Sequence, residues 1–195
     1  MLKINALFAW SHQAIEESSF NATTLCELYE VDPDHEMPGM NKLKVILISA
    51  ICECFMSDFL LRMKSDHPEL PRLKISKSAT NEALKRKSWR FVEMVKFFND
   101  NEIIHELNHD FYKDLNEIRV ARNRVHLLGA EGVLKQGRDH AFFSDYNMAK
   151  AEKVLESMLF VLNKKYRRES IATKSEIKLP WKPWYKTYWD EANFD

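Results

Sequence analysis

The chain has 195 residues, of which 45% are hydrophobic and 30% are charged, and its 29 basic residues balance its 29 acidic ones. This length fits one domain, and the composition is too apolar for a disordered chain. Four glycines and six prolines are too few for an all-β protein with many tight turns.

The first 40 residues predict an N-terminal helical extension. Residues 2–30 show helical periodicity, and a breaker-rich loop follows at 32–39. The start of the chain is apolar over too short a stretch for a signal peptide, and no segment reaches the ~18 apolar residues that span a bilayer. The three cysteines lack the spacing of a disulfide framework or a zinc site. We therefore expect a cytoplasmic protein with no membrane segment.

The central part of the chain predicts the bundle itself. The segment 41–64 is apolar on almost every face, which is typical of a buried central helix. Further helices are predicted over 80–99 and 101–128, where apolar residues recur at spacings of three and four. Ser144 is a candidate N-cap for a fifth helix.

These elements together predict an all-α, up-and-down bundle of about five helices. The extension covers residues 1–40, the bundle residues 41–169, and an irregular basic and aromatic tail residues 170–195. The tail is expected to pack on the bundle or on a partner, since exposed tryptophans are costly. The alternative is that its aromatic and basic residues bind single-stranded nucleic acid.

Two motifs compete on the predicted fourth helix. The first is His105-Glu106-Leu107-Asn108-His109, the HExxH pattern in which two histidines bind zinc and the glutamate activates water. On a helical wheel both histidines fall on the face turned away from the apolar stripe. Two solvated histidines are therefore the favoured interpretation, with a zinc hydrolase as the alternative.

The second motif gathers Arg119, Arg122, Asn123 and His126 into one polar patch beside the apolar stripe. None of Arg119, Arg122 and Arg124 has an acidic residue three or four positions away on the helix. Guanidinium groups without a local carboxylate favour binding of an anion such as phosphate. The alternative is that these cations only offset the helix dipole.

The segment from Glu117 to His126 resembles the motif of HEPN domains, a family of compact α-helical bundles whose motif is an arginine, four to six residues, and a histidine. Glu53, acidic amid apolar residues, resembles the acidic position of the family's first core helix. The resemblance covers roughly residues 41–166. It implies a metal-independent endoribonuclease that needs no cofactor and acts as a homodimer with a composite site. It also implies a role as a toxin or in phage defence, with a possible antitoxin partner.

The resemblance implies a role for each residue of the patch. His126 would transfer protons, Arg119 and Arg122 would stabilise the phosphate, and Asn123 would orient the histidine or the phosphate. Glu53 would be an auxiliary group facing the motif helix, or else a charge at a packed helix edge. The products would be a 2′,3′-cyclic phosphate and a 5′-hydroxyl. Some family members are non-catalytic nucleotide-binding or assembly modules, and this alternative stays open.

Charge is distributed unevenly along the chain. Residues 1–40 carry a net charge of −6 and residues 161–189 a net charge of +6. The basic end either binds an anion such as RNA or is neutralised by the acidic end, within a chain or across a dimer. The candidate RNA-binding cations are Arg124, Lys164, Lys165, Arg167 and Arg168.

Overall fold

The computed structural model describes residues 1–6, 9, 11–64, 75–104, 110–126, 143–167 and 176–185, without the side chains of Asn5, Pro38 and residues 124–126. Six helices and two short strands lie in these ranges. They are β1 (Leu2–Asn5), α1 (His12–Val31), α2 (Pro38–Lys64), α3 (Lys77–Lys85), α4 (Phe91–Asp100), α5 (Phe111–His126), α7 (Asp145–Tyr166) and β2 (Glu176–Leu179). The described chain is a helical bundle, so the predicted all-α class is confirmed.

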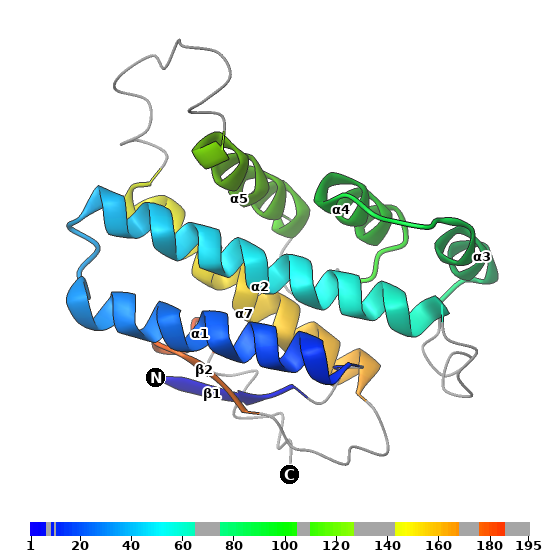
Figure 1. The fold of residues 1–195 in the computed structure, drawn as a ribbon, viewed down its shortest axis with the longest axis horizontal. Helices are drawn as coiled ribbons and strands as arrows, with labels where there is room; N and C mark the ends of the chain where they lie inside the picture. The colour runs from blue at the N-terminus through cyan, green and yellow to red at the C-terminus, as the bar shows by residue number, and fades with distance from the viewer. Residues whose placement is uncertain are drawn as a thin grey trace.

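Helix α2 lies at the centre of the bundle, between α1 on one side and α5 on the other, with α7 behind it (Figure 1). Residues Ile48, Ile51 and Phe55 of α2 are fully buried and belong to one hydrophobic core. That core extends from Leu2 to Trp181, so all three predicted segments contribute to it. Each fully buried apolar side chain of this size contributes about 1.5–3 kcal/mol to folding.

The two ends of the chain form a small antiparallel sheet. The helix predicted from residue 2 is wrong at its start, because Leu2 and Ile4 alternate with polar residues and pair with Leu179 and Ile177 of β2. All four of these apolar side chains are buried. The tail, predicted to be irregular, therefore contains a strand at Glu176–Leu179.

The helix predicted over 80–99 is two helices, α3 and α4, with a break at residues 86–90. The Glu93 carboxylate accepts a hydrogen bond from the Arg90 backbone N–H at 2.9 Å, which starts α4 afresh. A carboxylate three residues inside a helix commonly makes this contact. The apolar spacing runs through the break, so periodicity alone did not reveal it.

The last two predicted helices also differ at their ends. The fourth was expected from residue 101, but Asn101 caps the end of α4, and α5 is described only from Phe111 to His126. The fifth is α7, and Ser144 stands at its N-cap as predicted. Its side chain makes no capping hydrogen bond, contrary to the expectation.

Buried polar contacts tie both ends of the chain to the bundle. The Lys44 ammonium of α2 lies 2.7 Å from the Asp32 carboxylate and 2.6 Å from the Asp32 carbonyl, and both side chains are buried. On α7, the Glu156 carboxylate accepts from the Trp181 indole at 3.2 Å and from the Tyr185 backbone N–H at 2.9 Å. The described part of the tail, residues 176–185, therefore packs on the bundle of the same chain. No described helix has the length and apolar character needed to cross a membrane.

Candidate functional site

Arg122 of α5 contacts residues of two other helices, α2 and α4. Its guanidinium group donates to the Glu53 carboxylate of α2, and both side chains are about three-quarters buried. Its Cζ atom also stands 5.9 Å from the centre of the Phe91 ring at the start of α4. Glu53 thus contacts the motif helix, while its auxiliary role stays a prediction. The charge of Arg122 has a carboxylate partner, although that partner is 69 residues away in the sequence.

Arg119 lies one turn before Arg122 on α5 and has a different environment. Its Nε and Nη2 atoms donate to the side-chain oxygen of Asn116, at 3.0 Å and 2.9 Å. Asn116 is neutral, and no carboxylate among the described residues contacts Arg119. The amide thus orients the guanidinium group without neutralising it. Asn123 is exposed on the same helix.

His126 is the last residue of α5. The backbone of α5 is one continuous helix from Phe111 to His126, so positions 119 and 126 are separated by about two turns. The side chains of Arg124 and His126 lie outside the described part of the structure. The predicted meeting of Arg119 and His126 therefore stays a prediction.

The cations predicted at the end of α7 lie at a different end of the bundle from the motif. Lys164 packs over the Phe160 ring at 5.6 Å, Lys165 is half-buried and Arg167 is exposed, while Arg168 is outside the described residues. The Tyr166 carbonyl beside them accepts from Arg62, which lies nine residues after Glu53, about 14 Å along α2. Lys164, Lys165 and Arg167 are therefore not part of the same local patch as Arg119 and Arg122.

The alternative zinc motif falls outside the described residues, since His105, Glu106 and His109 are not among them. Within the described ranges, no group of three or more His, Cys, Asp or Glu side chains is arranged to hold a metal ion.

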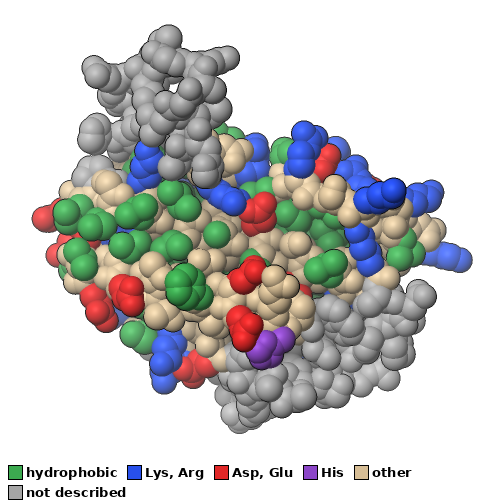
Figure 2. All heavy atoms as spheres, viewed as in Figure 1, with side chains coloured by type: hydrophobic (Ala, Val, Ile, Leu, Met, Phe, Trp, Pro, Cys, Tyr) green, Lys and Arg blue, Asp and Glu red, His purple; other side chains and the backbone are tan. Residues whose placement is uncertain are grey.

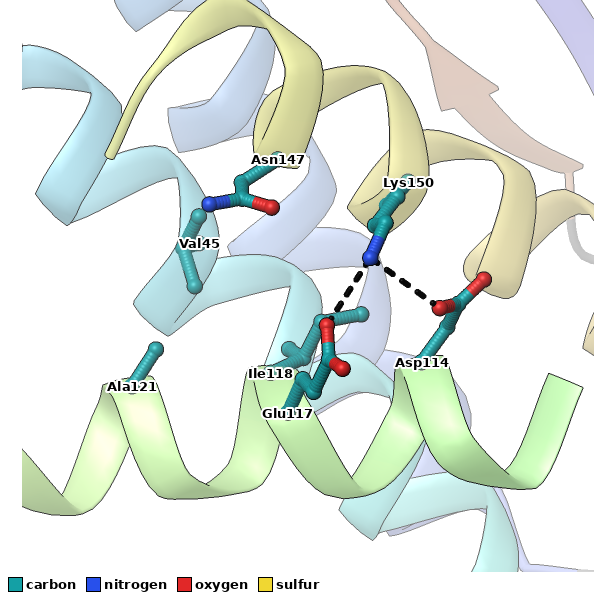
Figure 3. Close-up of a pocket in the computed structure, with 7 residues that line it drawn as sticks. All are labelled: Val45, Asp114, Glu117, Ile118, Ala121, Asn147 and Lys150. Carbon is teal, nitrogen blue, oxygen red and sulfur yellow. Dashed lines mark hydrogen bonds and ion pairs between the residues drawn. The ribbon is translucent and has the colours of Figure 1, made fainter. Parts of the chain in front are cut away.

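The opposite face of α5 is fixed to α7 by an ion-pair cluster (Figure 3). The Lys150 ammonium lies 2.9 Å from Glu117 and 3.4 Å from Asp114. Burial raises the pKa of Asp114 against the opposing effect of Lys150, and the hydrogen bond to Glu117 raises the pKa of Lys150. The pocket beside them measures about 20 Å³, which suffices for one water molecule and is too small for a nucleotide. This cluster positions the motif helix.

A larger cleft, of about 440 Å³, opens between α1, α2 and α4. Glu53 and Trp89 both line it, so it adjoins the Arg122–Glu53 pair. Its other lining residues include Ser11, Glu17, Cys54 and Asp58. Sequence reasoning did not find this cleft or the role of Asn116, because both depend on how distant helices and neighbouring rotamers pack.

The described aromatic residues of the tail do not join the motif. Trp181 is 7% exposed, and Trp184 donates its indole N–H to Glu152 of α7 at 2.8 Å. The β1–β2 sheet and α5 lie on opposite sides of the bundle (Figure 1). The aromatic residues within 176–185 therefore pack on their own chain and are not arranged as a surface on which nucleic-acid bases stack.

Comparison of this chain with protein-family models, with curated proteins and with solved structures found no match. A function for the chain therefore has to be inferred from its own residues.

Proposed function

We propose that this chain is a metal-independent endoribonuclease of HEPN type, acting as a toxin or phage-defence effector, with a composite Arg/His site at a homodimer interface. The observation that carries the proposal is the contrast on α5: Arg119 is oriented by a neutral amide while Arg122 is held by Glu53. One arginine is thus available to bind an anion, and the other is fixed beside it.

The chemistry that follows needs no metal. An imidazole titrates near neutral pH, so His126 can take the 2′-hydroxyl proton or protonate the leaving 5′-oxygen. Arg119 would contact the phosphate and stabilise the charge that develops on it, and Asn123 would help orient it. Glu53 would act as a positioning residue by fixing the rotamer of Arg122.

The surface of α2 supports the homodimer. Leu43, Ile46, Leu47 and Ala50 form an apolar stripe along α2, in which Leu43 is 47% exposed, the other three are partly buried, and Leu47 also packs against the hydrophobic core. Figure 2 shows hydrophobic side chains gathered over the first half of α2. Glu53 continues the same helical line three residues after Ala50, so the stripe leads directly to the Arg122–Glu53 pair. A partly exposed apolar stripe of this kind favours contact with another protein surface, and a second copy would bring two motifs together.

The test is incubation of the full-length chain with single-stranded RNA in excess EDTA. We expect cleavage that persists in the chelator and is lost in His126→Ala. His12→Ala is the matched control, because His12 is an exposed helical histidine on α1 that contacts only Glu16 in the described structure; this variant should cleave normally. Cleavage that stops in EDTA would contradict the proposal and favour the zinc hydrolase.

A non-catalytic RNA- or nucleotide-binding or assembly module is the second candidate. The observation that favours it is the ion pair between Glu53 and Arg122, because an arginine paired with a carboxylate is less able to bind phosphate. This candidate predicts RNA or nucleotide binding by the same protein without any cleavage.

A further inference from the structure

The end of α3 and the segment that joins it to α4 carry a dense group of cations outside the motif. Lys85, Arg86, Lys87 and Arg90 fall within six residues, and we call them the α3–α4 basic patch. From residue 77 to residue 93 the net charge is +3. Figure 2 shows Lys and Arg side chains gathered over this end of the molecule.

Part of the patch is held rigidly by contacts within the chain. The Arg86 guanidinium stacks over the Trp89 ring at 4.5 Å and lies 3.5 Å from both Glu82 and Glu93. The Arg86 carbonyl accepts from the Lys64 ammonium at 2.6 Å. These contacts fix the backbone on both sides of the break between the two helices.

The two lysines have no such contacts. Lys85 and Lys87 are exposed, and neither ammonium group has a hydrogen bond or an ion pair to any described residue. Arg90 is also largely exposed and shares Glu93 with Arg86. A helix dipole favours cations at the end of α3, but Lys87 and Arg90 lie beyond that end. The fixed backbone therefore presents ammonium groups to solvent without a structural partner for them.

The patch adjoins the motif through two neighbouring residues. Phe91 follows Arg90 directly, and its ring lies against Arg122. Trp89 lines the same cleft as Glu53. The patch is therefore joined along the chain to two residues, Trp89 and Phe91, that lie beside the Arg122–Glu53 pair.

We propose that the α3–α4 basic patch binds the phosphate backbone of single-stranded RNA as the strand leaves the motif. The inference rests on the proposed function, because it takes RNA as the ligand of the adjoining motif. Ammonium groups bind phosphates as point charges, and the covered face of Trp89 leaves no stacking platform there. The contacts are therefore independent of base sequence, and they extend the substrate beyond the scissile phosphate.

The test measures RNA binding by fluorescence anisotropy, with the full chain carrying His126→Ala so that the RNA stays intact. Lys85→Ala and Lys87→Ala together should weaken binding to a labelled single-stranded RNA about tenfold at 0.1 M salt. The slope of log affinity against log salt should fall in magnitude by about 1.4, because each single-strand phosphate contact contributes about 0.7.

The matched control replaces Lys178 and Lys182, two exposed lysines on the opposite side of the bundle, with alanine. It should leave both the affinity and the slope unchanged. Equal RNA affinity of the Lys85/Lys87 variant and its parent would overturn the inference. An acidic protein would then be the ligand that the patch fits. If the patch variant weakens RNA binding while the wild-type chain never cuts RNA, the binding surface stands and the nuclease proposal fails.

Discussion

Arg119 and Arg122 show how one helix can give two arginines separate tasks. Both lie on α5 three residues apart, but Asn116 contacts one and Glu53 contacts the other. An arginine that is about three-quarters buried with a carboxylate partner contributes to stability, whereas a guanidinium group bound only by an amide keeps its charge for a ligand.

This difference predicts distinct results for two alanine variants. Arg119→Ala should lower kcat/KM for RNA cleavage by about 10²–10³, the effect of losing one preorganised charge donor, with an unchanged melting temperature. Arg122→Ala should also lower the free energy of unfolding by about 1 kcal/mol, because Glu53 is left about three-quarters buried without a partner. Cleavage kinetics and urea unfolding measure the two effects. An Arg119→Ala protein that cuts RNA normally would contradict the assignment.

Asp32 gives a pH dependence that can be measured independently of any activity. Burial of its carboxyl group raises the pKa, but the hydrogen bond and charge of Lys44 and the Met37 backbone N–H together bring the pKa below its ordinary value. The stabilisation is therefore present above the unfolded pKa of about 3.9 and is lost as the pH falls through the lower folded value.

Asp32→Asn should be less stable at pH 7 by about 3 kcal/mol, since the buried Lys44 ammonium loses its carboxylate. The variant should also lose less stability than the wild type when the pH is lowered below 4. Urea unfolding between pH 7 and pH 2.5 tests this. If the free energy of unfolding falls equally for the two proteins below pH 4, Asp32 is not the source of the pH dependence.

At the scale of elements, the apolar spacing predicted most helices but not their breaks. The segment 80–99 has continuous helical periodicity, yet Arg90 and Glu93 restart the helix within it. Leu2 and Ile4 form a strand only because β2, from the far end of the chain, pairs with them. The sequence left open whether Glu53 faces the motif helix or is a charge at a packed helix edge, and contacts between distant segments bring it to Arg122.

Helix α2 is apolar on nearly every face. The packing of a single chain buries most of these apolar side chains but not all of them. It lies centrally as predicted, but Leu43 remains 47% exposed and Leu47 is only partly buried. We expect Leu43→Glu combined with Leu47→Glu to convert a dimer into monomers in sedimentation equilibrium, because two carboxylates would be desolvated at the interface.

Leu84→Glu is the control for this pair, since Leu84 on α3 is exposed to the same extent as Leu43. It should leave the sedimentation behaviour unchanged. A wild-type chain that sediments as a monomer at all concentrations would argue against the composite site.

At the scale of the whole molecule, both ends of the chain belong to one core. Trp181 is buried against α7, where its indole N–H donates to Glu156. Trp184 donates its indole N–H to Glu152 of the same helix but remains 44% exposed. Trp181→Ala should lower the free energy of unfolding by about 3 kcal/mol, and Trp184→Ala by clearly less. Similar small losses in urea unfolding for both variants would show that the tail is not part of the core.

The central claim is that His126 and the arginines of α5 cleave RNA without a metal ion. Analysis of the RNA ends formed in EDTA tests it most directly. The account predicts 2′,3′-cyclic phosphate and 5′-hydroxyl ends from the wild-type chain and intact RNA from His126→Ala. Products with 5′-phosphate ends, or the same products from His126→Ala, would contradict it.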